Sequence, residues 1–544
     1  MKAMSYTHGA SSTPLLGETI ASNLKSTVDK FPNADAIVSI HQNYRATYKE
    51  FWGQVEVVSK ALLALGLYKG ERIGIWSPNR YEWVLLQYAT ARVGLILVNI
   101  NPAYRTSELT YVLNQSRTRF LFASLKFKTS NYFQMVEEAK TDCPDLEKAF
   151  FFENDWSDFL EHANKISDSV LHAAENILHF DEPVNIQYTS GTTGFPKGAK
   201  LSHHNLLNNG FFIGERLHYT QKDRVCIPVP FYHCFGMVIG NLACTTHGSC
   251  MVIPSEGFEP KKALEAVSLE KCTSLYGVPT MFIAELELPN FSEYDLTTLR
   301  TGVMAGSPCP VEVMKNVQSK MYMKEVSICY GMTETSPVSL QTMIGAPLEK
   351  QVGTVGTVQD HLEIKIIDPE TQLVTPRGTH GELCTRGYSV MLGYWDNDKA
   401  TNDSIDESGW MHTGDLGVMD DEGYVNIVGR IKDMILRGGE NVYPREIEEF
   451  LYTHPDVEDV QVIGVPSEKF GEEVMAWIKI KTGHTCDENS LKAFCNQKIA
   501  HYKVPRYWKF VDSFPTTVTG KIKKGDMRTQ SIKELGLIAS GQNS

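Results

Sequence analysis

The segment from Tyr188 to Gly198 combines glycines, hydroxyl residues and a lysine in the order YTSGTTGFPKG. Glycines permit tight backbone turns, and Ser and Thr hydroxyls together with free backbone amides can donate hydrogen bonds to phosphate oxygens. The segment differs from a P-loop, because Pro196 precedes Lys197 where that motif needs glycine. A polar surface turn is the simpler alternative, but the density of donors favours a phosphate-binding loop. Its candidate ligands are Thr189, Ser190, Gly191, Thr192, Thr193, Gly194 and Lys197.

Acidic, aromatic and basic residues recur in further short motifs along the chain. A carboxylate in such a motif can accept hydrogen bonds from ribose hydroxyls or hold a hard cation such as Mg²⁺. Taken singly, each has an ordinary structural alternative, because an Asp in a Thr-Gly-Asp turn is usually a cap. In chain order the motifs are Tyr330-Gly-Met-Thr-Glu-Thr335, Gly381-Glu-Leu-Cys-Thr-Arg-Gly387, Thr413-Gly-Asp415, Gly429-Arg-Ile-Lys-Asp433 and Pro515-Thr-Thr-Val-Thr-Gly-Lys521.

Together these segments resemble the adenylate-forming superfamily, which includes acyl-CoA synthetases, nonribosomal-peptide adenylation domains and beetle luciferases. Tyr188–Gly198 is similar to the phosphate loop of that superfamily, and the other motifs follow in the superfamily's order. The matches cover roughly residues 40–525, nearly the whole chain. Three segments most resemble the medium-chain fatty acyl-CoA synthetase branch, namely Tyr232–Cys234, Val390–Trp395 and Arg437–Pro444.

The resemblance implies a role for each matching residue in binding ATP and its metal. Asp415 would accept both ribose hydroxyls, with Arg430 fixing ribose and phosphate, and Glu334 with Thr189 would hold Mg²⁺ on the triphosphate. Tyr330 would stack on adenine. The other edge of the base would be lined by Gly306, Ser307 and Pro308, and the nucleotide set also includes Gly331 and Thr333.

Lys521 matters most for the chemistry that the resemblance implies. This lysine would enter the site from a C-terminal domain and bridge carboxylate and phosphate oxygens, because attack of one anion on another requires charge compensation. The domain would then rotate at a hinge, Lys432, removing Lys521 and bringing a loop to a tunnel for the pantetheine arm of CoA. Gly438 and Gly439 would let that loop approach the thiol arm closely.

The expected activity is therefore that of an acyl-CoA synthetase, which turns ATP, a medium-chain fatty acid and CoA into acyl-CoA, AMP and diphosphate. His233 would lie beside the substrate carboxylate, although a hydrogen-bonded core histidine is the alternative. The acyl tail would contact Phe231, Phe235, Met237 and Tyr276–Met281. Two other functions stay open, namely an aryl-CoA ligase or acyl-AMP ligase with a non-CoA acceptor, and a catalytically silent binding protein.

The elements that must position these residues alternate between strands and helices. Arg72–Trp76, Leu95–Ile100 and Arg119–Ala123 are predicted strands, with helices at Tyr81–Val93 and Asn131–Ala139. This alternation predicts α/β layers around a largely parallel sheet. A second α/β set spans residues 225–330, with predicted strands at Cys250–Ile253 and Val326–Cys329. A small β-rich subdomain is predicted at Leu362–Trp395. After Gly429 a new unit is predicted, with a helix at Arg445–Tyr452, strands at Val460–Val465 and Val474–Ile480, and a helix from Glu488.

The fold class is thus α/β, with a large N-terminal adenylation domain of stacked α/β subdomains (residues 1–430), the hinge at Lys432 and a mobile α+β domain (residues 433–544).

The net charge of −13 and pI of 5.7 exclude a general affinity for nucleic acid or anionic membrane. The eleven cysteines form no CxxC pair and show no metal-ligand spacing, which indicates reduced thiols. No apolar stretch approaches the ~20 residues that span a bilayer. Without a secretory h-region, the cytoplasm is the expected compartment, or the mitochondrial matrix if a presequence has been removed.

Overall fold

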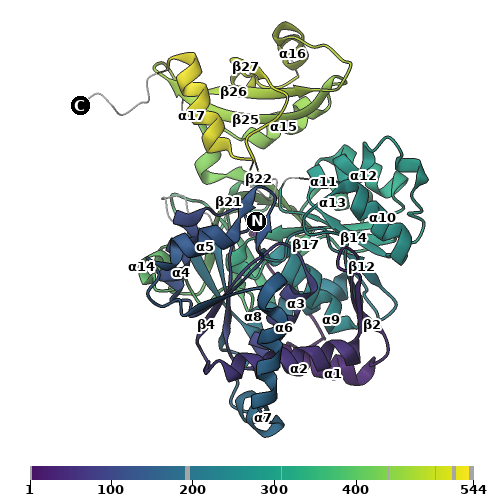
Figure 1. Cartoon of the computed structure of the whole chain (residues 1–544). Helices are drawn as coiled ribbons and strands as arrows, with labels where there is room; N and C mark the ends of the chain where they lie inside the picture. The colour runs from purple at the N-terminus through teal and green to yellow at the C-terminus, as the bar shows by residue number, and fades with distance from the viewer. Residues whose placement is uncertain are drawn as a thin grey trace. The chain divides into compact units, whose positions relative to one another are not determined.

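The computed structural model describes residues 3–189, 196–307, 309–438, 440–496, 498–516 and 522–537 (Figure 1). The chain divides into two compact units. The large unit comprises Tyr6–Ile364 and Cys384–His412, and the small unit comprises Met1–Ser5, Lys365–Leu383 and Thr413–Ser544. The predicted division into residues 1–430 and 433–544, with its hinge at Lys432, stays a prediction.

The large unit contains a six-stranded sheet in which all neighbouring strands run parallel except the last pair, β10 and β11. Its strands are rich in β-branched and aromatic residues and are nearly continuously buried, as expected when helices cover both faces of a parallel sheet. In spatial order they are β11 (Lys197–Ser202), β10 (Pro183–Thr189), β5 (Ile96–Asn99), β4 (Arg72–Trp76), β6 (Phe120–Ala123) and β9 (Lys148–Phe151).

A nine-stranded sheet forms the second layer of the large unit. Its central strands are parallel and its outer strands antiparallel. The N-terminal hairpin of β2 and β3 joins this sheet beside β13, a long-range pairing that the strand–helix pattern did not predict. In spatial order the strands are β18 (Thr357–Val358), β17 (Val338–Gln341), β16 (Glu325–Gly331), β15 (Thr301–Ala305), β14 (Ser274–Gly277), β12 (Arg224–Cys226), β13 (Cys250–Ile253), β2 (Asp35–Ser39) and β3 (Tyr44–Thr47).

Helices carry the apolar faces that fill the core of the large unit. The second helix, α2, begins at a capping box in which Thr47 accepts from the Glu50 amide and the Glu50 carboxylate accepts from Thr47. The helices are α1 (Ile20–Lys30), α2 (Tyr48–Ala64), α3 (Tyr81–Arg92), α4 (Thr106–Ser116), α5 (Tyr132–Lys140), α6 (Phe152–Glu161), α7 (Asp168–Glu175), α8 (His203–Arg216), α9 (Ala243–His247), α10 (Pro260–Glu270), α11 (Pro279–Leu286), α12 (Val311–Lys320), α13 (Leu348–Gly353) and α14 (Asp398–Ser404), with a π-helix at η2 (Phe235–Leu242).

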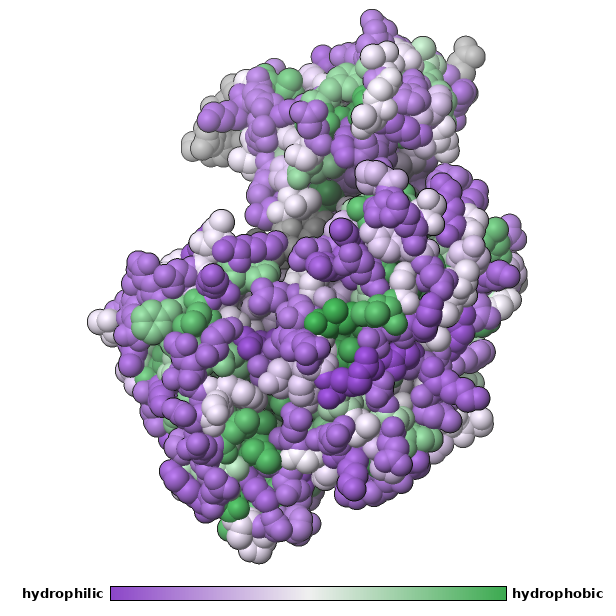
Figure 2. All heavy atoms as spheres, turned by 45° about the vertical axis from the view of Figure 1, so that its right-hand side comes forward, coloured by the Kyte–Doolittle hydropathy of each residue, from purple (hydrophilic) through white to green (hydrophobic). Residues whose placement is uncertain are grey.

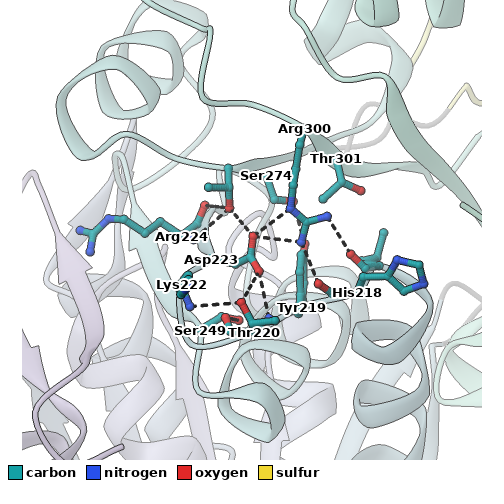
Figure 3. A network of polar contacts seen from close by, with 12 residues as sticks. His218, Tyr219, Thr220, Lys222, Asp223, Arg224, Ser249, Ser274, Arg300 and Thr301 are labelled. Carbon is teal, nitrogen blue, oxygen red and sulfur yellow. Dashed lines mark hydrogen bonds and ion pairs between the residues drawn. The ribbon is translucent and has the colours of Figure 1, made fainter.

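A buried polar network connects the amino ends of strands β12, β14 and β15 to the segment that follows α8 (Figure 3). Asp223, 4% exposed, accepts from the Thr220 amide (2.9 Å), the Thr273 hydroxyl (2.7 Å) and Nε of Arg300 (3.1 Å). Nη2 of Arg300 also donates to the carbonyl oxygen of His218 (2.9 Å). Because burying a carboxylate is unfavourable unless donors surround it, these bonds make Asp223 a structural anchor.

The C-terminal part of the small unit is a sheet with helices on both faces (Figure 1). Side chains alternate along β25 and β26, so that Val460 and Val462 pack with α15 and α16, whereas Ile463 and Val465 pack with Met527 of α17. The elements are β23 (Ile435–Arg437), β24 (Glu440–Val442), α15 (Pro444–Tyr452), β25 (Val457–Ser467), β26 (Gly471–Ile480), α16 (Glu488–Cys495), β27 (Tyr507–Phe510) and α17 (Lys524–Leu535).

The predicted β-rich segment Leu362–Trp395 contributes two strands to a five-stranded sheet. The division between the two units falls within β19, β20 and β21 of this sheet. Its order is β1 (Tyr6–His8), β19 (Leu362–Ile367), β20 (Gly381–Gly387), β21 (Met411–Met419) and β22 (Val425–Arg430).

The structure confirms the α/β prediction. Among the described residues, no helix is long and apolar enough to cross a membrane. The face in Figure 2 is largely hydrophilic, with separate hydrophobic patches.

Candidate nucleotide and acyl site

The predicted phosphate loop connects two antiparallel strands of the large unit. Thr189 ends β10 and Lys197 begins β11, and the two residues face each other across the ladder. Gly198 is required next to them, because a Cβ there would lie 2.8 Å from Ile186 Cγ2 and 3.4 Å from the Tyr188 ring. The loop residues between them, Ser190, Gly191, Thr192, Thr193 and Gly194, lie outside the described residues.

Glu334 lies in a short 3₁₀ turn, η4 (Thr333–Thr335), which follows β16. Its side chain is buried, with the residue 5% exposed. Two hydroxyls contact the same carboxylate oxygen, Oε1: Thr189 Oγ1 at 3.2 Å and Tyr394 OH at 2.8 Å. The structure therefore brings together the two residues that the sequence assigned to a metal ion, and adds Tyr394.

Backbone pairing with β11 places Tyr394 at this carboxylate. The Leu392 amide donates to the Lys200 carbonyl oxygen (2.9 Å), and the Trp395 amide donates to that of Gly198 (2.8 Å). Burial raises the pKa of Tyr394, and the negative charge of Glu334 and its hydrogen bond raise it further, so the phenol stays protonated as a donor. Nζ of Lys197 lies 5.1 Å from the centroid of the Tyr394 ring, within cation–π range.

The residues predicted to hold adenine lie at the carboxyl ends of adjacent parallel strands. Ala305 of β15 pairs with Cys329 of β16, so Gly306 and Tyr330, the residues after them, lie at the same sheet edge. Such an edge is where ligands bind in open α/β sheets. Ser307 follows, half-buried, and Pro308 lies outside the described residues.

Two glycines at this edge satisfy different backbone requirements. Gly306 has φ +87°, which favours glycine. A Cβ on Gly331 would lie 1.8 Å from the Pro337 carbonyl oxygen, so only glycine permits this approach. Thr333, 7% exposed, begins the turn that carries Glu334.

His233 precedes the π-helix η2, an element often found at functional sites. Its Nδ1 accepts from the Phe235 amide at 3.1 Å, which leaves Nε2 to carry the proton of the neutral ring. Within η2, the sulfur of Met237 lies 2.8 Å from Nε2 of Gln187 and 3.2 Å from Nδ2 of Asn99. This polar lining holds η2 against β10 and β5.

Six of the residues predicted to contact the acyl tail belong to one buried apolar cluster, whereas Thr280 is exposed. The six are Phe231, Phe235, Met237, Tyr276, Val278 and Met281. The rings of Phe235 and Tyr276 lie 5.9 Å apart, and Phe231 is fully buried. Met237 and Met281, 1% and 9% exposed, complete the set. These side chains therefore form the apolar surroundings that a fatty acyl chain needs.

Asp415 and Arg430 belong to the small unit and face each other across β21 and β22. Nε of Arg430 lies 3.0 Å from Oδ1 of Asp415, and the Asp415 amide donates to the Thr413 hydroxyl at 3.1 Å. Lys432 follows β22 in a 3₁₀ turn, η5 (Ile431–Asp433), and is exposed.

Gly438 turns the chain between β23 and β24 with φ +61°. Its amide donates to the Phe470 carbonyl oxygen (2.8 Å), and a Cβ would lie 3.1 Å from Phe470 Cδ1. The preceding Arg437 binds Glu473 through two hydrogen bonds, of 2.8 and 3.0 Å, which fix the base of this turn. Gly439 and Lys521 lie outside the described residues.

The predicted site residues thus form three groups in the large unit and two in the small unit. Thr189 contacts Glu334 and pairs with Lys197; Gly306, Ser307, Tyr330, Gly331 and Thr333 share a sheet edge; and His233 adjoins the apolar cluster. Tyr394 received no role from the sequence, although it lies in the segment Val390–Trp395 that carried the resemblance to medium-chain enzymes. That resemblance was the available signal.

Known proteins resemble this chain over nearly its whole length. The chain is 47% identical over 546 residues to the putative acyl-CoA synthetase YngI of Bacillus subtilis, covering 97% of this chain and 99% of that protein. It is 43% identical to the medium-chain acyl-CoA ligase ACSF2, mitochondrial, of Danio rerio, covering 98% and 91%.

Solved structures share the architecture over nearly the whole chain. The anthranilate CoA ligase AuaEII in complex with anthranoyl-AMP has a TM-score of 0.85 at 25% identity, covering 96% of this chain and 99% of that one. ATP-bound MatB from Rhodopseudomonas palustris has a TM-score of 0.82 at 27% identity, covering 96% and 100%.

Family models match both parts of the chain. The AMP-binding enzyme model covers residues 24–395, and the AMP-binding enzyme C-terminal domain model covers residues 446–521. The chain therefore belongs to the AMP-binding enzyme family.

Proposed function

We propose that this protein is an ATP-dependent acyl-CoA synthetase for medium-chain fatty acids. In the first half-reaction, a carboxylate oxygen attacks the α-phosphorus of ATP and diphosphate leaves, giving an acyl-adenylate. In the second, the CoA thiol attacks the acyl carbonyl, the thiol proton is lost, and AMP leaves. The observation that carries the proposal is the buried Glu334 carboxylate, bound by Thr189 and Tyr394 beside the hairpin that presents Lys197.

Glu334 and Thr189 fit a magnesium ion on the triphosphate. A carboxylate and a hydroxyl oxygen are hard donors, and theirs lie 3.2 Å apart. A magnesium ion held there would neutralise charge on the phosphate oxygens. Tyr394 keeps the Glu334 carboxylate in place, and Lys197 supplies a further positive charge beside them.

Residues of the small unit would bind the ribose of ATP and compensate the charge of the two reacting anions. Asp415, held in place by Arg430, would accept the ribose hydroxyls. Lys521 would bridge the attacking carboxylate and the α-phosphate, which requires charge compensation because both are anions. Rotation of the C-terminal domain at Lys432 would then remove Lys521 from the site. The turn at Gly438 and Gly439 would take its place for the thioester step.

The medium-chain preference rests on two observations. The chain is 43% identical to a protein named medium-chain acyl-CoA ligase, and six of the predicted tail-binding residues lie in one apolar cluster. Each methylene that such a cluster takes from water contributes about 0.8 kcal/mol, close to fourfold in affinity. An aryl-CoA ligase is the second candidate, since one structural relative is named an anthranilate CoA ligase.

A diphosphate-release screen over straight-chain and aromatic acids, with and without CoA, tests the proposal. A medium-chain acid should give the highest kcat/KM, and CoA should be required for multiple turnovers. A preference for aromatic acids would establish the second candidate. Multiple turnovers without CoA would show that another acceptor takes the acyl group.

The predicted compartment stays the cytoplasm, with the mitochondrial matrix as the alternative; the Danio rerio relative is named mitochondrial.

A further inference from the structure

Two short segments of the small unit bring together imidazole, carboxylate and thiol groups that the proposed reaction does not use. His454 and Asp456 follow α15, whereas His484 and Cys486 follow β26. One ligand atom from each of His454, Asp456 and Cys486 can be chosen so that all three lie within 4.8 Å of one another. The sequence spacing gave no indication of this cluster, because 28 residues separate Asp456 from His484.

The Asp456 carboxylate lies between the two imidazoles. Its Oδ1 is 2.7 Å from Nδ1 of His484, and its Oδ2 is 4.0 Å from Nδ1 of His454. His454 is 6% exposed, and its ring meets the Phe494 ring edge-on at 4.8 Å. Burial and ring packing therefore fix the imidazole that faces the carboxylate.

Backbone contacts hold the two segments in register. Val457 pairs with Ile480 across β25 and β26, and the Lys481 amide donates to the Asp456 carbonyl oxygen at 2.9 Å. Gly483, with φ +82°, makes the turn in which the His484 amide donates to the Lys481 carbonyl oxygen at 3.0 Å. The cluster is thus built on a pre-formed scaffold.

Cys486 differs from the other cysteines of the chain. Ten of the eleven are buried, where a thiol packs like a small apolar group, whereas Cys486 is half-exposed. Its Sγ lies 3.8 Å from the Asp487 carbonyl oxygen, a weak contact that a stronger ligand can replace. A half-exposed thiol beside a carboxylate and an imidazole is suited to metal binding.

We propose that His454, Asp456 and Cys486 bind a Zn²⁺ ion and that His484 orients the Asp456 carboxylate. Zn²⁺ takes imidazole nitrogen, thiolate sulfur and carboxylate oxygen together, and three protein ligands leave a fourth position for water. Thiolate and carboxylate together balance its charge. The site is independent of the proposed acyl-CoA synthetase function.

The ligand atoms need only a small closure to reach tetrahedral geometry. Zinc–ligand bonds of about 2.0–2.3 Å set ligand atoms about 3.3–3.8 Å apart. Side-chain movements of about 1 Å would therefore bring the ligand atoms, now within 4.8 Å of one another, to these distances. The lone pair on Nδ1 of His454 accepts a hydrogen bond from the Asp456 amide at 3.2 Å, and Zn²⁺ would take the place of that donor. Nδ1–H of His484 donates to the carboxylate, a hydrogen bond that commonly supports a metal-binding carboxylate.

The ammonium of Lys481 would repel a metal ion bound nearby, and the negative charges of the thiolate and carboxylate ligands must offset this repulsion. Nζ of Lys481 donates to the Pro455 carbonyl oxygen at 2.7 Å. A bound ion would connect the end of α15 to the turn after β26, and binding to the folded state alone raises stability. The consequence is a metal-dependent stability of the small unit.

Cobalt titration of the full chain tests the site, after chelator treatment and desalting and without nucleotide. Co²⁺ should bind one per chain with a thiolate-to-cobalt charge-transfer band, and Zn²⁺ should displace it and raise Tm. Cys486→Ala should abolish the band, and Asp456→Asn should weaken binding. His484→Gln should weaken it about 10–100-fold. His501→Gln, at an exposed histidine of the same unit, is the matched control and should match wild type.

The proposal fails if wild type shows no charge-transfer band, or if Cys486→Ala and Asp456→Asn bind Co²⁺ as tightly as wild type. Circular dichroism checks that each variant folds. Should Cys486→Ala be misfolded, the affinity of Asp456→Asn decides between the outcomes.

Discussion

The hydroxyl of Tyr394 donates to Oε1 of Glu334 at 2.8 Å, although 60 residues separate them in the chain. Thr189 contacts the same oxygen, so within the described part of the chain the other oxygen, Oε2, has no protein donor. A carboxylate fixed through one oxygen can offer the second to a ligand. Under the proposed function, Tyr394 would therefore be a positioning residue that acts through Glu334.

Replacing Tyr394 by Phe should raise the Mg²⁺ concentration needed for half-maximal adenylation and lower kcat/KM about 10–100-fold. The reason is that a hydrogen bond to a charged group contributes about 1.5–3 kcal/mol. Initial rates across a Mg²⁺ series measure the effect. Tyr44→Phe, which loses a 2.8 Å hydrogen bond to Gln54 elsewhere in the large unit, should leave the Mg²⁺ dependence unchanged.

A double variant separates positioning from a general structural effect. If Tyr394 acts through Glu334, Tyr394→Phe combined with Glu334→Gln should be no less active than Glu334→Gln alone. Fully additive losses would remove Tyr394 from the account.

Asp223→Asn should destabilise the large unit strongly. The amide replaces an acceptor that binds Thr220, Thr273 and Arg300, and breaking a buried ion pair typically costs about 3–5 kcal/mol. Thermal scans at one heating rate should show a clear fall in Tm. Asp295→Asn, at an exposed pair with Lys271, is the matched control and should change Tm little. Equal shifts for both variants would contradict the anchoring role of Asp223.

Glu285 should make stability fall as pH rises. This residue of α11 is 1% exposed, neither carboxylate oxygen has a hydrogen-bond partner among the described residues, and burial raises its pKa well above 4.5. The folded state therefore keeps a proton that the unfolded state loses above the unfolded pKa. Stability from Glu285 is full below that value and is lost as pH rises towards the folded pKa.

Glu285→Gln removes this titration and should be more stable than wild type at neutral pH. The stability difference between them should grow by up to about 1.4 kcal/mol per pH unit from about pH 5 upward, as far as the folded pKa. Tm measured for both proteins across this range tests it. A constant difference would mean that Glu285 is ionised in the folded protein.

Lys432→Pro should impair thioester formation more than adenylation, because a rigid residue at the proposed hinge restricts rotation. Diphosphate exchange measures the first step, and acyl-CoA formation from supplied acyl-adenylate measures the second. Lys432→Ala removes the charge without the ring and should partition as wild type does. Unchanged partitioning in Lys432→Pro would exclude this hinge.

Local pattern predicted many elements well. Arg72–Trp76 and Cys250–Ile253 are strands with the predicted bounds, and Tyr81–Val93 ends one residue later than α3. These segments are largely continuous apolar runs, so residues close in sequence are enough to predict them. Parallel strands were likewise predictable from the alternation with helices.

Long-range pairing was not predictable in the same way. The hairpin of β2 and β3 joins a sheet whose other strands begin about two hundred residues later, and no local pattern specifies that neighbour. The Tyr394–Glu334 contact depends on pairing of residues 392–395 with β11. The cluster at His454 and Cys486 needs the register of β25 on β26. Such contacts arise only from tertiary structure.

We propose that Lys521 allows the carboxylate to attack ATP and is dispensable afterwards. The most direct measurement compares Lys521→Ala with wild type in exchange of labelled diphosphate into ATP with a medium-chain acid, and in acyl-CoA formation from supplied acyl-adenylate. The variant should lose exchange by at least about 10²–10³-fold and largely keep thioester formation. Retained exchange, or equal loss of both steps, would contradict it.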